Sequence, residues 1–116
     1  MLRAVAWLRE TRQATPVLVG VYSFGAVMAM RAAGRSSWDG LLLVAPPVGR
    51  LKVERPELPT LVILGDQDQF VEVEQVSQYF ASNARVEVLS GADHFFMGES
   101  ESIRRIVSDF ITSLAN

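Results

Sequence analysis

Short runs of apolar residues, rich in branched aliphatic side chains, divide the chain into regular segments. Three of them are continuous: VLVGVY at 17–22, GLLLVA at 40–45 and TLVILG at 60–65. A continuous apolar run of this length is typical of a strand that is buried on both faces of a sheet. A fourth segment, RVEVL at 85–89, alternates apolar and charged residues as an edge strand does. The pattern therefore predicts four strands.

Apolar residues with helical spacing lie before, between and after these runs. Positions i, i+3 and i+4 predict helices over 2–13, 24–33, 72–82 and 103–114. The element order is then α-β-α-β-β-α-β-α. Apolar strands in this order predict an α/β fold with a four-stranded, mainly parallel sheet and helices on both faces. We see no repeat or linker, so residues 1–116 are expected to form a single domain.

Composition and charge narrow the classes of function. The 116 residues are 49% hydrophobic and 21% charged, with a net charge of −2, which is typical of a globular domain. Because the basic residues are scattered, neither nucleic acid nor a membrane surface is an expected partner. The chain has no cysteine and a single histidine, His94, so no metal or other cofactor is expected. The longest apolar stretch, 16–30, is shorter than the roughly 20 residues that span a bilayer, and the expected location is the cytoplasm.

Polar side chains follow three of the predicted strands. Ser23 follows the first strand, Asp66 and Asp68 follow the third, and His94 follows the fourth. Because the carboxyl ends of parallel strands meet at one edge of a sheet, we expect these side chains to lie close together. Each of them alone is an ordinary turn or cap residue. Together they indicate nucleophilic catalysis, since a serine hydroxyl needs an imidazole as base and a carboxylate to orient that imidazole.

The motifs around these residues resemble the C-terminal half of the α/β-hydrolase superfamily, closest to its small lidless, dienelactone-hydrolase-like esterases. The segment YSFG at 22–25 resembles the nucleophile elbow, a sharp turn from strand to helix. The segment ILGDQDQFV at 63–71 resembles the pattern Gly-x-x-Asp-x-x-Val, whose acid would be Asp68 rather than its neighbour two residues earlier. The segment GADHFF at 91–96 resembles the loop that carries the catalytic base.

This resemblance implies a serine hydrolase that acts on a small, ester-like substrate. Ser23 would be the nucleophile, His94 the general base and Asp68 the orienting carboxylate. The backbone N–H of Phe24 would be an oxyanion donor. The 46–59 segment is short where related enzymes insert a lid, so an open site is expected. The apolar residues that could line it are Pro46, Pro47, Val48, Phe70, Phe95 and Phe96, although at least one of the phenylalanines is expected to pack under the last helix instead.

Two departures from the family pattern lower the expected activity. Val21 stands where the elbow motif Gly-x-Ser-x-Gly has its first glycine, and a β-branched residue should crowd the turn. The early strands of the family's sheet, which supply a second oxyanion donor, are expected to be missing, and losing one donor typically costs about 10²–10³ in kcat. The 17–22 strand is then left with an open apolar edge, which predicts a homodimer or larger oligomer that covers it.

Two other interpretations stay open. The chain could be a catalytically inactive α/β-hydrolase-like remnant that acts as an oligomeric or partner-binding module, which Val21 and the missing oxyanion donor favour. The segment DQD at 66–68, after an apolar strand, also fits the Asp-x-Asp of a magnesium-dependent phosphatase. That interpretation gives no role to Ser23 or His94, and the only lysine, Lys52, precedes the motif.

Overall fold

The computed structural model describes residues 18–33, 38–47, 57–80 and 84–115, and the helix expected over 2–13 lies outside these ranges. The described residues form four strands and three helices. Their bounds are β1 Leu18–Tyr22, α2 Phe24–Ala33, β2 Gly40–Val44, β3 Thr60–Gly65, α3 Val73–Phe80, β4 Arg85–Leu89 and α4 Ser100–Ala115. Each element predicted within the described ranges is present, within a turn of its predicted ends.

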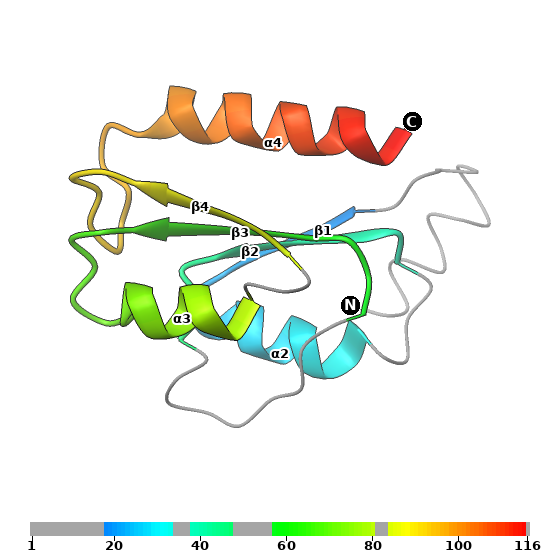
Figure 1. Ribbon diagram of the computed structural model, residues 1–116, viewed down its shortest axis with the longest axis horizontal. Helices are drawn as coiled ribbons and strands as arrows, with labels where there is room; N and C mark the ends of the chain where they lie inside the picture. The colour runs from blue at the N-terminus through cyan, green and yellow to red at the C-terminus, as the bar shows by residue number, and fades with distance from the viewer. Residues whose placement is uncertain (1–17, 34–37, 48–56, 81–83, 116) are drawn as a thin grey trace.

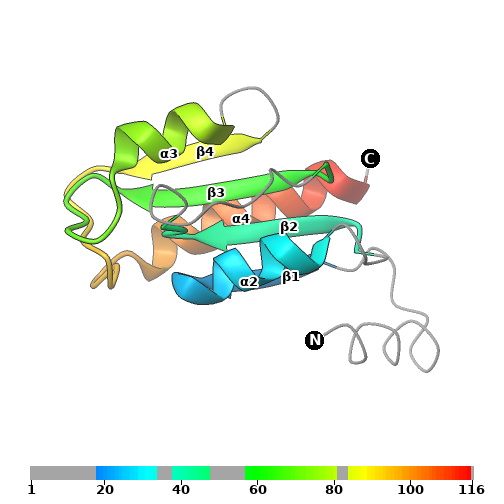
Figure 2. The ribbon, with the colours of Figure 1, turned by 90° about the horizontal axis from the view of Figure 1, so that it is seen from below.

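The four strands form one sheet in the order β1-β2-β3-β4, and every neighbouring pair is parallel. Val21 pairs with Leu43, Leu43 with Val62, and Val62 with Val86, so one row of apolar residues crosses the sheet. Helix α4 covers one face, and α2 and α3 cover the other (Figures 1 and 2). The predicted α/β architecture is confirmed, with a sheet that is parallel throughout its described strands.

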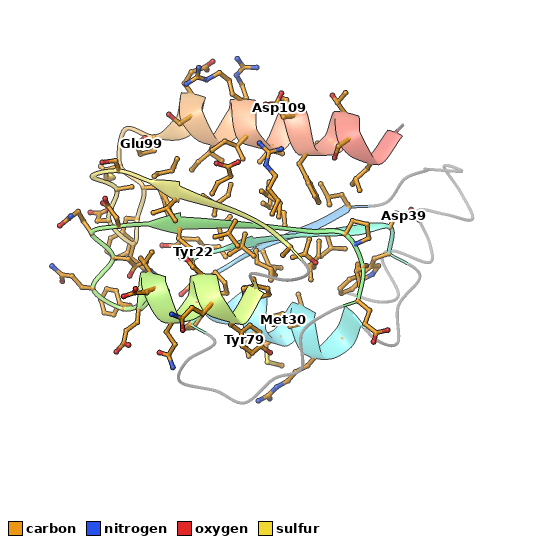
Figure 3. All side chains as sticks on the ribbon, in the orientation of Figure 1. Tyr22, Met30, Asp39, Tyr79, Glu99 and Asp109 are labelled. Atoms are coloured by element: carbon orange, nitrogen blue, oxygen red, sulfur yellow. The ribbon has the colours of Figure 1, made fainter. Side chains whose placement is uncertain are left out.

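The core lies on both faces of β3, the strand whose six residues are all buried. Phe80 of α3 packs on one face and is fully buried, while Phe110 of α4 is 5% exposed on the other. Figure 3 shows Met30 of α2 on the same side as α3, and Asp109 on the helix across the sheet. Helices α3 and α4 turn most of their apolar residues to the sheet and polar ones to solvent, whereas α2 is apolar almost throughout and exposes Met28 and Arg31. None of the described helices is long and apolar enough to cross a membrane.

Strand β1 differs from its predicted environment, because it is only partly buried. Gly20 is exposed and Tyr22 is 43% exposed. The physical reason is the position of β1 in the sheet: it pairs only with β2, so one of its edges has no neighbouring strand within the part of the chain that the structure describes. An apolar run thus indicates a strand of a parallel sheet, but not how central that strand is.

The loops after β3 and β4 are tied together at the carboxyl edge of the sheet. The backbone N–H of Gln67 donates to the carbonyl of Ala92 at 2.9 Å, and the side chain of Asp66 accepts the N–H of Gly91 at 2.7 Å. Gly65 has to lack a side chain here, because a Cβ atom would lie 2.3 Å from the carbonyl oxygen of Ala92. These contacts fix the loop after β4 against the end of β3.

Candidate active site

The serine of the predicted elbow lies in a strained turn between β1 and α2. Ser23 has a φ of 56°, a left-handed conformation that is unfavourable for a residue with a side chain. Its N–H donates to the carbonyl of Val44 at 2.7 Å, and its own carbonyl accepts the N–H of Ala26 at 3.0 Å. The crowding expected from Val21 is accommodated, because a Cβ atom on Gly25 would still lie 3.9 Å from the Cβ of that valine. The sharp turn is therefore kept without the first glycine of the motif.

Three side chains from distant parts of the chain form a continuous line of contacts. The Oγ of Ser23 lies 3.0 Å from Nε2 of His94, and Nδ1 of His94 lies 2.7 Å from Oδ2 of Asp68. The other carboxylate oxygen of Asp68 accepts the backbone N–H groups of Phe70 at 2.7 Å and Val71 at 3.0 Å. The Asp68 side chain is only 1% exposed, so both of its oxygens are fixed by protein donors.

The order of these contacts sets the direction of each hydrogen bond. An ionised carboxylate only accepts hydrogen bonds, so the ring proton of a neutral His94 sits on Nδ1 and is donated to Asp68. Nε2 is then an acceptor, and the hydroxyl of Ser23 donates to it. A proton that leaves the serine can move to Nε2, and the buried carboxylate stabilises the imidazolium that forms.

Tyr22, which the sequence analysis did not single out, also contacts the histidine. Its hydroxyl donates to the backbone carbonyl of His94, and the two ring centroids lie 5.2 Å apart. Partial burial, followed by the negative charges of Asp68 and Asp93, raises the pKa of Tyr22, so the phenol stays a neutral donor. Figure 3 labels this residue at the end of β1. Its signal in the sequence is an aromatic hydroxyl directly before the serine of the elbow.

The aromatic residues expected near the site divide into two groups. Phe70 and Phe95 are 49% and 66% exposed, and their ring centroids lie 5.0 Å and 5.6 Å from that of His94. Phe96 is only 8% exposed and belongs to the hydrophobic core, so it is a phenylalanine of this set that packs inside and does not line the site. Phe96 has a φ of 54°, a left-handed conformation, in the loop after β4.

The segment after β2 is described only in part. Pro46 is fully buried and Pro47 is partly exposed, while Val48 lies outside the described residues. The structure thus places Pro46 in the interior rather than on a substrate-facing surface. The absence of a lid over this segment stays a prediction from the length of 46–59.

The two acidic residues after β3 do not converge on a common point. Asp66 is exposed and accepts the N–H of Gly91, whereas Asp68 contacts His94. No group of three or more His, Asp or Glu side chains that could hold a metal occurs among the described residues. This arrangement gives no support to the magnesium-phosphatase interpretation of the DQD segment.

Comparisons with known proteins agree with this geometry. A family model described as an alpha/beta hydrolase domain matches residues 1–112. The structure of an alpha-beta serine hydrolase homologue from Coxiella burnetii has a TM-score of 0.77 and 30% identity, over 90% of this chain and 53% of that one. The structure of an a/b serine hydrolase without a lid, from Xanthomonas campestris, has a TM-score of 0.82 and 29% identity, over 97% of this chain and 54% of that one. An uncharacterized protein of Rickettsia prowazekii is 24% identical over 127 residues, 96% of this chain and 53% of that protein.

The family match over residues 1–112 includes the elbow and both loops that carry His94 and Asp68. The chain spans about half the length of the relatives it matches. The family match extends over nearly the whole chain, and the parallel sheet has the same fold as solved serine hydrolases. The resemblance seen in the short motifs is therefore confirmed at the level of the family. On this evidence, the chain belongs to the α/β hydrolase family.

Proposed function

We propose that the protein is a serine hydrolase that cleaves small carboxylic esters. One observation carries the proposal: Ser23 Oγ, His94 and Asp68 form an unbroken line of hydrogen bonds of 3.0 Å and 2.7 Å. Hydrolases of this kind need a hydroxyl, an imidazole and a carboxylate in this order of contact. A serine, histidine and aspartate that served only as turn residues would not require such a line.

The proposed reaction has two halves. In the first, Ser23 Oγ attacks the ester carbonyl carbon while its proton passes to Nε2 of His94. The tetrahedral adduct collapses, the bond to the alcohol oxygen breaks, and His94 gives its proton to that oxygen. In the second half, His94 takes a proton from water, and the resulting hydroxide attacks the acyl-serine. The collapse of the second adduct releases the acid and returns the proton to Ser23.

The elbow supplies the electrostatic part of the proposal. Phe24 is the first residue of α2, and the first N–H groups of a helix have no acceptor within that helix. The N–H of Phe24 is thus the donor we assign to the oxyanion, helped by the positive end of the helix dipole. The left-handed φ of Ser23 supports this assignment, because such a turn presents the hydroxyl and the following N–H to one side.

The test is the hydrolysis of p-nitrophenyl acetate by the wild type and by Ser23→Ala. The wild type should hydrolyse the ester faster than buffer alone. The rate above that of buffer should be at least 10³-fold lower for Ser23→Ala than for the wild type. Ser90→Ala is the matched control, because Ser90 is an exposed serine in the turn after β4. Equal activity of wild type and Ser23→Ala would overturn the proposal.

A non-catalytic module is the second candidate, and the unpaired edge of β1 favours it. Among the described strands β1 pairs only with β2, and an open strand edge is a template for another strand. We propose that the chain self-associates through this edge whether or not it is catalytic. Light scattering at micromolar concentration should give the mass of a dimer or larger species. A monodisperse monomer would contradict this association, and ester turnover that requires Ser23 would contradict a purely non-catalytic role.

A further inference from the structure

Two exposed phenylalanines, Phe70 and Phe95, flank the histidine of the proposed site. Phe70 follows β3 and Phe95 follows β4, so the fold brings them together from 25 residues apart. Their ring centroids lie 6.5 Å apart with an interplanar angle of 79°, and each ring also packs edge-on against His94. Large apolar side chains that cluster in an exposed position mark a surface that binds something apolar.

The backbone at both phenylalanines is held by carboxylates of the same two loops. The N–H of Phe70 donates to Oδ1 of Asp68 at 2.7 Å, the same carboxylate that contacts His94. The N–H of Phe95 donates to the side chain of Asp93 at 3.0 Å. The backbone positions from which the two rings project are therefore fixed together with the loops of the imidazole and its carboxylate, as expected of a preformed binding surface.

We infer that Phe70 and Phe95 bind the alcohol part of the substrate, and that this part is an uncharged aryl group such as benzyl. The inference rests on the proposed function. His94 gives its proton to the alcohol oxygen as the ester bond breaks, so the carbon substituent on that oxygen lies beside the rings that pack on His94. Edge-to-face contact with two rings suits an aromatic group.

The charges around the two rings favour a neutral group. Asp66 and Asp93 are both exposed and lie in the same two loops as the phenylalanines. A carboxylate or phosphate on the alcohol part would be repelled by these like charges, above all by Asp93, whose side chain accepts the N–H of Phe95. The subsite is thus expected to reject anionic alcohols and to accept apolar ones.

The test compares benzyl acetate with ethyl acetate, whose leaving alcohols have similar acidity and which share one acyl group. The ratio of kcat/KM for the benzyl over the ethyl ester should be about tenfold or more in the wild type. Phe95→Ala and Phe70→Ala should each bring this ratio several-fold closer to one. Ile111→Ala is the control, because Ile111 is 45% exposed on α4 and lies outside both loops. The benzyl-to-ethyl ratio of kcat/KM for this variant should match that of the wild type.

A binding measurement separates the failure of this inference from the failure of the proposed function. N-benzylacetamide is an uncleaved analogue, and it should shift the NMR signals of Phe70 and Phe95 in the Ser23→Ala variant. It should bind several-fold more weakly to the double variant that carries both Ser23→Ala and Phe95→Ala. Turnover that needs Ser23, with a benzyl-to-ethyl ratio unchanged by both phenylalanine substitutions, would overturn the inference alone. Failure of N-benzylacetamide to shift either signal would also overturn it. Turnover that is independent of Ser23 would overturn the proposed function.

Discussion

Replacement of Asp68 by asparagine is a sharp test of how the proposed site works, because it changes the charge of the side chain and almost nothing in its shape. The asparagine oxygen can still accept the hydrogen bonds from the backbone N–H groups of Phe70 and Val71. Its NH₂ group then faces Nδ1 of His94 across 2.7 Å, a distance at which two donors cannot both keep their protons. The ring escapes the clash by moving its proton to Nε2, and Ser23 loses its acceptor.

The size of the effect follows from which interactions survive. The wrong tautomer in a comparable hydrolase triad lowers kcat by about 10⁴, which corresponds to about 5.4 kcal/mol at 1.36 kcal/mol per tenfold. Folding should suffer less, because only the charged bond to His94 is lost, and bonds of that kind contribute about 1.5–3 kcal/mol. Asp68→Asn should therefore be folded and nearly inactive.

The assay measures p-nitrophenyl acetate turnover and the free energy of unfolding in urea for the same preparations. Asp66→Asn is the matched control, because Asp66 accepts the N–H of Gly91 and makes no hydrogen bond to His94. This control should keep most of the wild-type activity. The reasoning is refuted if a folded Asp68→Asn retains activity within tenfold of the wild type, or if the two variants lose equal activity.

Further predictions concern the residues that support the site. Tyr22→Phe removes the hydrogen bond to the backbone carbonyl of His94 in the loop after β4. This change should lower kcat on the same ester roughly tenfold with little change in KM. Tyr79→Phe, on α3, is the control. Because the pKa of Tyr22 is raised in the folded state, the folded protein holds a proton that the unfolded chain releases. The free energy of unfolding should therefore fall as the pH rises above the ordinary tyrosine pKa of about 10. Tyr22→Phe should make this fall smaller in urea titrations. Gly65→Ala forces a Cβ atom to within 2.3 Å of a backbone oxygen and should cost several kcal/mol and most of the activity, whereas Gly20→Ala, with its nearest contact at 3.4 Å on a side chain, should fold normally by circular dichroism. Phe80→Ala empties a fully buried position and should cost about 3–5 kcal/mol of unfolding free energy.

The fold was accessible from the sequence because its strands are short, apolar and separated by helical spacing. The runs at 40–45 and 60–65 lie at interior positions of the sheet, where burial on both faces demands apolar residues. The run at 17–22 has the same composition but lies at an edge of the described sheet. The local pattern could not show this, because the exposure of a strand depends on its neighbours.

The contacts of the site were accessible only in part. The motif around 63–71 distinguished Asp68 from Asp66, and the structure has Asp68 against the histidine. The bond from Tyr22 to the histidine carbonyl could not be predicted, nor which of the phenylalanines packs inside, because both depend on how the loop after β4 folds back over the sheet. The oligomeric state and the cytoplasmic location stay predictions.

The most direct measurement of the central claim is the labelling of the protein by a fluorophosphonate, followed by mass spectrometry of the intact chain and its peptides. Such probes react with a serine whose hydroxyl is activated by an adjacent base. The account predicts one adduct, on the peptide that contains Ser23, and its loss in Ser23→Ala and in His94→Ala. An adduct on any other residue, or equal labelling of wild type and Ser23→Ala, would contradict it.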